Sequence, residues 1–245
     1  MPGGWQVDLM LGGIVMAGAS VQWLTGMGFA LVSVPALVLV LGPADGVRLV
    51  NCAAGVISLA GFGGGWRRVR PAAMVPLILA SVCTVPAGSW VASRLPAPVL
   101  MVGMGGLVTA LVLFVMRGGR MTALRGMRGA LTAGAAGGFM NSSAGVGGPP
   151  VSMYAVNAGW TVREFVPNAQ FYSITVNAVS VAANGVPRVG GTVWELAAAG
   201  LVLGAVIGKI LADRVPEDGA RRLVLLLALA GGVTTLGKGL WLVFY

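Results

Sequence analysis

The chain has 245 residues, of which 57% are hydrophobic and only 9% are charged, and its formal net charge is +9. A water-soluble domain of this length needs more charged side chains to cover its surface. The composition therefore indicates an integral membrane protein. The basic residues are mostly loop arginines without interleaved aromatic residues, which favours contact with lipid headgroups and argues against nucleic-acid binding.

The sequence has no histidine and two cysteines, Cys52 and Cys83, which lie in apolar segments. Without histidine, Ser-His-Asp or Cys-His hydrolysis, histidine-ligated metals and a histidine proton relay are all excluded. The two cysteines form no C-x-x-C motif, which argues against a zinc site or a disulfide framework. We therefore expect no enzyme, with no catalytic residue, no metal and no cofactor.

Eight apolar segments follow one another along the chain. Two of them, about 8–41 and 130–157, contain glycine or proline near their midpoints. The other six are uninterrupted and run about 49–65, 71–92, 98–116, 165–184, 192–212 and 219–244. Since a full span needs about 20 apolar residues, each interrupted segment is too long for one span and too short for two. It is a long broken helix, a re-entrant hairpin or a pair of short spans.

The positions of the 16 lysines and arginines favour the hairpins. If each interrupted segment crosses once, the two sides hold nine and seven of them; if each returns to its own side, the division is twelve and four. The smaller group is Arg48, Arg94, Arg188 and Lys238. Cytoplasmic loops carry the excess of positive charge, so this group is expected outside the cytoplasm. Pairs of short spans would give the same division.

The hairpin topology gives each half three crossings, so the second half is inverted relative to the first. The sequence thus predicts an all-α polytopic membrane protein of two inverted-topology repeats, each a broken or re-entrant helical hairpin plus three transmembrane helices. We expect the first repeat in residues 1–116 and the second in 129–245. Residues 117–128 form a basic cytoplasmic linker, which could also bind anionic lipid.

Equivalent positions recur in the two halves. A shift of 119 residues relates Gly26 to Gly145, Gly28 to Gly147, Asn51 to Gln170 and Ser58 to Asn177. A shift of 120 residues relates Gly88 to Gly208. Internal duplication of a broken hydrophobic segment is typical of secondary transporters.

A helix break at membrane depth exposes backbone polar groups, so it must line a cavity or be covered by protein. The start of the following half-helix offers free N–H groups and a positive dipole end, which together bind anions. The second break has donors, glycines and an opening proline: Asn141, Ser142, Ser143, Gly145, Gly147, Gly148 and Pro149. The first break, with Thr25, Gly26 and Gly28 one turn after Gln22, is a poorer version. The alternative is that these glycines only permit close helix crossing.

Polar residues also share one face of the 165–184 segment, namely Gln170, Ser173, Asn177 and Asn184. Asn51 and Ser58 have the same seven-residue spacing in the 49–65 segment. A polar stripe is costly against lipid, so it faces protein or water. Interhelical hydrogen bonding is the alternative. Because the repeat shift relates Asn51 to Gln170, we expect both, with Asn177, in a substrate site between the halves.

Other glycines predict close helix packing, because small residues four apart let backbones approach. They are Gly200, Gly204 and Gly208 in one segment and Gly134 with Gly138 in another. All acidic residues fall near segment ends, which leaves Glu164 and Glu195 as the ones to test for a role in transport.

The paired glycine motifs, the second reading Ser143-Ala144-Gly145-Val146-Gly147-Gly148-Pro149-Pro150, and the duplication resemble the TauE/SafE family of sulfite exporters over essentially the whole chain. The first copy departs from the family pattern, since Phe29-Ala30 follows Gly28 where a third glycine is common. The resemblance implies transport of a small sulfur-containing or organic anion, such as sulfite or a sulfonate, across the bacterial inner membrane.

The sequence therefore predicts a multi-pass secondary transporter, most simply an exporter, that holds a small anion between the two breaks and works by alternating access. Its expected partners are the anion and the lipid bilayer. A passive anion channel and an importer of organosulfonates or carboxylates are alternatives. The anion, the direction, the coupling ion (proton or sodium) and homo-oligomer formation stay open.

Overall fold

The computed structural model describes residues 4–63, 65–118, 125–212 and 217–244, and they form helices and no strand. The first half contains α1 (Gly4–Thr25), α2 (Phe29–Leu41), α3 (Pro43–Phe62), the short 3-10 helix η1 (Gly65–Arg68), α4 (Pro71–Arg94) and α5 (Ala97–Met116). The second half contains α6 (Gly126–Ala144), α7 (Gly148–Asn157), α8 (Val162–Asn184), α9 (Gly191–Ala212) and α10 (Glu217–Phe244). Helices α1, α3, α4, α5, α9 and α10 are long and apolar enough to cross a membrane, which confirms the all-α polytopic class.

Both helix breaks occur at equivalent positions. The α1–α2 break covers residues 26–28 and the α6–α7 break covers residues 145–147, each pair of positions being 119 apart. Each break opens with a glycine of positive φ, 79° at Gly26 and 71° at Gly145. This left-handed backbone is easily reached only by glycine, which explains why the chain ends a helix there.

The first break reverses the chain. Ser33 Oγ of α2 donates a hydrogen bond to the carbonyl of Ile14 at 3.4 Å, and Gly18 lies against Phe29 and Ser33, so α2 folds back along α1. The two arms of this hairpin differ in length, since α1 has 22 residues and could span alone, whereas α2 has 13. Helix α8 differs from expectation, because its polar stripe keeps it outside the six apolar candidates.

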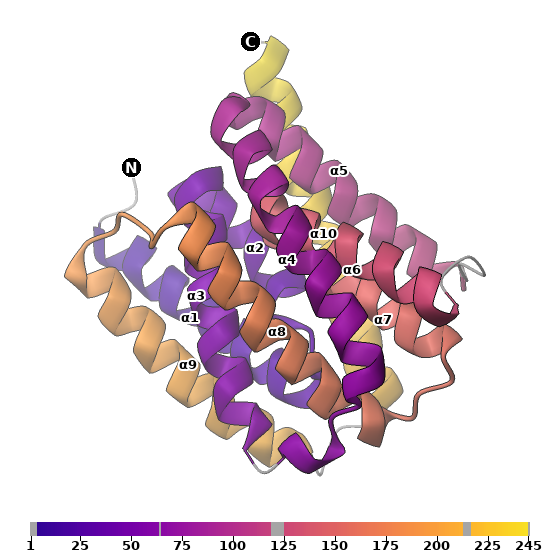
Figure 1. The fold of residues 1–245 in the computed structure, drawn as a ribbon. Helices are drawn as coiled ribbons and strands as arrows, with labels where there is room; N and C mark the ends of the chain where they lie inside the picture. The colour runs from indigo at the N-terminus through magenta and orange to yellow at the C-terminus, as the bar shows by residue number, and fades with distance from the viewer. Residues whose placement is uncertain (1–3, 64, 119–124, 213–216, 245) are drawn as a thin grey trace.

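Helices from the two halves pack in matched pairs. Helix α1 packs on α9 and α4 on α6, while α3 packs on α8 and α5 on α10. The repeat shift makes α1 correspond to α6, α3 to α8, α4 to α9 and α5 to α10. Under this correspondence the α1–α9 pair becomes the α6–α4 pair, whereas the α3–α8 and α5–α10 pairs each stay the same pair. Figure 1 shows α9 beside α1, and α8 between α3 and α4. The inverted orientation and the repeat bounds stay predictions; residues 119–124 of the expected linker lie outside the described residues.

The predicted glycine ridges lie at two of these contacts. A Cβ atom on Gly204 of α9 would lie 2.6 Å from the Cβ of Ala19 in α1, and Gly200 and Gly208 approach α1 one turn to either side. Gly134 and Gly138 of α6 make the same approach to the backbone of α4. The small residues therefore set the distance between the halves.

Changing Gly204 to Ala is expected to destabilise the protein by roughly 1–3 kcal/mol, because the added methyl group forces α1 and α9 apart. Gly237→Ala in α10 is the matched control, since no atom lies within 4 Å of its would-be Cβ. The control should be neutral or slightly stabilising, as alanine favours helix over glycine. Thermal unfolding in detergent measures both; equal melting temperatures would contradict the packing.

Candidate functional site

The two helix breaks meet at a pocket, called the central pocket below. It is lined by Gln22, Met27, Ala30, Ala54, Asn141, Gly145, Gly147, Gly148, Tyr172, Ser173, Val176 and Asn177. The first break contacts the half-helix that follows the second break, since Ser152 Oγ of α7 lies 3.9 Å from Met27 Sδ. The cavity is small, about 30 Å³, and none of its lining side chains is charged.

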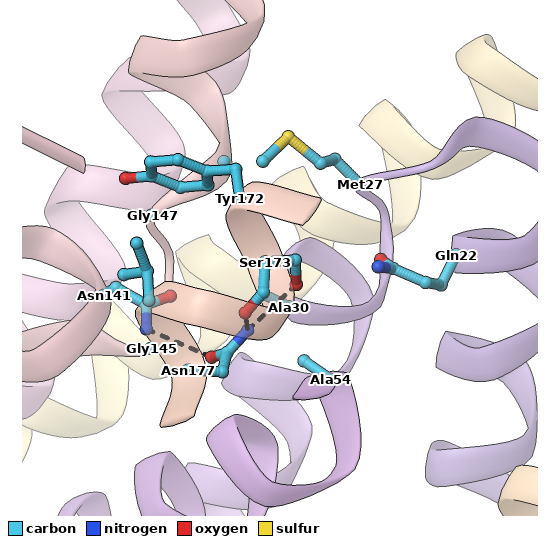
Figure 2. Close-up of a pocket in the computed structure, with 12 residues that line it drawn as sticks. Gln22, Met27, Ala30, Ala54, Asn141, Gly145, Gly147, Tyr172, Ser173 and Asn177 are labelled. Carbon is cyan, nitrogen blue, oxygen red and sulfur yellow. Dashed lines mark hydrogen bonds between the residues drawn. The ribbon is translucent and has the colours of Figure 1, made fainter. Parts of the chain in front are cut away.

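An amide side chain from each hairpin reaches the pocket from opposite sides (Figure 2). Gln22 of α1 and Asn141 of α6 are 119 residues apart, and each lies four residues before the glycine of positive φ. Gln22 Nε2 donates to Ser58 Oγ at 2.8 Å, and Asn141 Nδ2 donates to Asn177 Oδ1 at 3.1 Å. Ser58 and Asn177 are themselves equivalent by the repeat shift. Each hairpin is thus tied to the helix that follows it through equivalent positions.

These bonds join into one buried network. Ser58 Oγ donates to Ser173 Oγ at 2.8 Å, and Asn177 Nδ2 donates to the same oxygen at 2.9 Å. A hydroxyl has one donor hydrogen and two acceptor positions, so both acceptor positions of Ser173 are used. Its own hydrogen remains available, and Ser173 lines the central pocket. The network therefore presents a hydroxyl donor to whatever the pocket holds.

Two further amides lie close to the network with unsatisfied atoms. Asn51 is 1% exposed and Gln170 is 2% exposed. Asn51 Oδ1 lies 3.5 Å from Asn141 Nδ2, but Asn51 Nδ2 has no hydrogen-bond partner, and neither has Gln170 Oε1. Buried unsatisfied groups are uncommon and cost roughly 1–3 kcal/mol each. The two residues that carry this cost, Asn51 and Gln170, are the pair that the repeat shift relates.

The half-helices that follow the breaks differ in their backbone donors. The first N–H of α2, from Phe29, donates to Gln22 Oε1 at 3.0 Å, and the next residue, Ala30, lines the pocket. Helix α7 begins Gly148-Pro149-Pro150, and proline has no N–H. The first turn of α7 therefore offers fewer backbone donors than that of α2, although the first break looked the poorer one from sequence.

Five predicted residues line the central pocket: Asn141, Gly145, Gly147, Gly148 and Asn177. Neither Asn51 nor Gln170 lines it: Asn51 is buried beside Asn141, and Gln170 is buried about one helical turn before Ser173 on α8. Four others build the tips, namely Thr25, whose Oγ1 donates to the carbonyl of Val21, with Gly26, Gly28 and Pro149. Ser142 and Ser143 line a different cavity.

Sequence reasoning noted Gln22 one turn before the first break but did not assign it to the site, and it gave no role to Tyr172. The repeat shift itself could have found Gln22, as the equivalent of Asn141. Tyr172 had no such signal, since its equivalent in the first half is Ala53. Its ring lines the pocket while its Oη lies 2.9 Å from Ser81 Oγ, a hydrogen bond that joins α8 to α4.

The second cavity has a volume of about 170 Å³ and lies where α3 begins and α4 and α8 end. It is lined by Pro43, Ala44, Val47, Arg48, Ser89, Ala92, Ser93, Leu100, Met104, Ser142, Ser143, Ala183 and Asn184. Asn184 Nδ2 donates to the carbonyl of Ser142 at 2.8 Å, which fixes the end of α8 against the end of α6.

The other end of α8 is held by a polar clamp. Arg70 forms an ion pair with Glu164, and its backbone N–H donates to Asn168 Oδ1 at 2.8 Å. Asn168 Nδ2 donates to the carbonyl of Glu164 at 2.6 Å. The backbone N–H of Thr161 lowers the pKa of Glu164, and the Thr161 hydroxyl and Arg70 add to this. The clamp joins the start of α4 to the start of α8.

Comparison with curated proteins and with solved structures gives no match. A family model, described as Sulfite exporter TauE/SafE, matches residues 10–235, which confirms the resemblance seen in the motifs. The match includes both helix breaks and the central pocket. The chain belongs to the TauE/SafE family of sulfite exporters, a family of membrane transporters of sulfite or related anions.

Proposed function

We propose that the protein is a secondary transporter that exports sulfite or a similarly small sulfur-containing or organic anion by alternating access, with the anion held in the central pocket. The observation that carries the proposal is the meeting of two equivalent helix breaks at a pocket lined by amides, hydroxyls and glycines, without a charged side chain. A carboxylate there would repel an anion.

The donors available to the anion come from side chains and backbone. Ser173 supplies the hydroxyl hydrogen that its network leaves unused. Ala30 lies in the first turn of α2, where backbone N–H groups lack helical partners and the helix dipole is positive. Such neutral donors attract an anion without a full ionic bond, which suits a carrier that must also release it.

The pocket volume favours a compact anion. A single water needs roughly 10–15 Å³ of such space, so a cavity of about 30 Å³ accepts about two waters. An oxyanion of four heavy atoms, such as sulfite, is close to this limit. Longer sulfonates would need the two breaks to separate.

The proposal of alternating access rests on the matched packing of helices from the two halves. Helix pairs α1 with α9 and α4 with α6 exchange under the repeat correspondence, as a two-fold relation between the halves requires, and inverted repeats are one such relation. In such repeats one half rocks against the other around a fixed site. Equivalent amide hydrogen bonds, from Gln22 to Ser58 and from Asn141 to Asn177, keep the two hairpins in matching positions around the pocket.

Flux of labelled sulfite into proteoliposomes tests the proposal. The expected result is saturable flux that follows an imposed proton or sodium gradient. In detergent, sulfite should raise the melting temperature more than a long-chain sulfonate does, since a ligand of the folded state stabilises it. A non-saturating current without a coupling gradient would instead identify a channel, and no flux or stabilisation with any small anion would overturn the proposal.

A further inference from the structure

The second cavity has a position that the central pocket alone does not explain. Along α8, Asn184 lines the second cavity, Asn177 lines the central pocket and Asn168 belongs to the clamp. At 1.5 Å per residue these positions are about 10 Å and about 14 Å apart along the helix. Helix α3 repeats the order, with Arg48 in the second cavity and Ala54 in the central pocket.

We propose that the second cavity is an anion-binding vestibule, through which the transported anion passes between one membrane face and the central pocket, and that Arg48 is its cationic contact. The inference rests on the proposed function and adds to it a second site. The link between the two sites is the end of α6, where Asn141 lines the central pocket and the next residue, Ser142, lines the vestibule.

The lining of the vestibule suits a small anion. Arg48 is the one charged residue among its lining residues. The lining serines donate their hydroxyl hydrogens to backbone carbonyls, so Arg48 is the main donor left for an anion. Arg48 Nη1 bonds to Asp45 Oδ1 at 3.1 Å, and Asp45 also accepts the backbone N–H of Arg188 at 3.0 Å. A guanidinium has five N–H donors, so the ion pair orients Arg48 and leaves donors for the cavity. Asp45 itself is outside the lining.

The volumes of the vestibule and of the central pocket imply that the anion is hydrated differently in each. By the same measure of roughly 10–15 Å³ per water, a cavity of about 170 Å³ holds on the order of ten waters. An anion can therefore enter it with much of its hydration shell, whereas the central pocket of about 30 Å³ accepts it nearly bare. Arg48 would replace part of that hydration shell as the anion moves inward.

The opposite end of the molecule is held closed by contacts. The ion pair of Arg70 with Glu164 and the bonds of Asn168 join α4 and α8 there. Under this proposal, the anion passes between the central pocket and the Arg48 side. The arginine count predicts that this side is extracytoplasmic, so the vestibule acts as the exit during export.

Arg48→Gln tests the vestibule, with Arg94→Gln as the matched control. Arg94 lies at the end of α4, stacks on Trp90 and is exposed, so its loss removes the same charge near the same end without touching the lining. Initial sulfite uptake is measured in right-side-out and everted vesicles. Arg48→Gln should raise KM roughly fivefold for the face that carries Arg48, at unchanged maximal rate and unchanged KM from the other face. Added salt should shrink the difference.

The loss of Arg48 could disturb Asp45, so a second variant tests the vestibule by filling it. Ala183 is exposed and lines the vestibule, so Ala183→Trp should block flux. Stabilisation by sulfite should persist in detergent, because alternating access opens the central pocket to the other face as well. Normal saturable flux in Arg48→Gln and Ala183→Trp would overturn the vestibule and leave the proposed function intact. A KM effect confined to vesicles with anionic lipid would assign Arg48 to a headgroup and also overturn it. Absence of flux and stabilisation in the wild type would overturn both.

Discussion

Replacing Asn141 by Asp is expected to lower anion affinity by about three orders of magnitude and to abolish transport. Asn141 Nδ2 donates to Asn177 Oδ1 at 3.1 Å and to Ser180 Oγ at 2.9 Å, and Asn141 lines the central pocket. Aspartate keeps the shape but turns this donor into an acceptor. Its charge also repels the anion by about 4 kcal/mol at 4 Å and an effective dielectric constant of 20.

The matched control is Thr132→Asp. Thr132 lies on the same helix but is exposed, so it receives the same charge without entering the pocket. Its flux and its stabilisation by sulfite should stay at the wild-type level. Gln22→Glu should behave like Asn141→Asp, because Gln22 occupies the equivalent position of the first hairpin. Wild-type flux in Asn141→Asp would remove the central pocket as the anion site.

The local features of the site could be predicted from sequence. A glycine break within an apolar segment is a short-range signal, so Gly26 and Gly145 mark the ends of α1 and α6 as the structure has them. The repeat shift also pointed to Asn177, because two halves that bury equivalent polar positions bring them to a shared centre. The same shift of 119 residues relates Gln22 to Asn141, but the shift was applied to the glycines and not to the residue one turn before them.

Side-chain direction was the harder part. Ser142 and Ser143 directly follow Asn141, but successive helix residues point about 100° apart, so they face the second cavity and not the central pocket. Thr25 turns back to bond the carbonyl of Val21 in its own helix, as helical threonine commonly does. Proximity in sequence to a helix break therefore overestimates membership in the site.

Helix pairing was not accessible from the sequence pattern. Spanning helices are apolar on most faces, so periodicity does not indicate a neighbour. The glycine ridge on α9 predicted a close contact, but only the structure shows that α1 makes it. In helix α8 the sequence signal is polar. Its polar stripe lowers its mean hydropathy below that of the six apolar candidates, and Gln170, Ser173 and Asn177 of this stripe are buried in the structure.

Substitutions at Gly148 are expected to separate pocket filling from misfolding. A Cβ atom on Gly148 would lie 3.7 Å from Met27 Sδ, which is an ordinary contact, so Gly148→Ala should fold normally. Gly148→Leu should also insert, but its side chain would occupy a cavity of only about 30 Å³ between the two breaks. We expect partial flux from the alanine variant, with stronger rejection of larger anions, and no flux from the leucine variant.

Gly147→Ala should fail for a different reason, and the comparison isolates the pocket. Its Cβ would lie 2.7 Å from the carbonyl of Gly137 and 2.8 Å from Asn141 Cβ, so the break must distort and the melting temperature should fall. Gly13→Ala, with no atom within 4 Å of its would-be Cβ, is the neutral control for both. Unchanged melting in Gly148→Leu with loss of both flux and sulfite stabilisation would place the anion between the breaks. Normal sulfite flux in that variant would contradict this, because no anion can share that space with a leucine side chain.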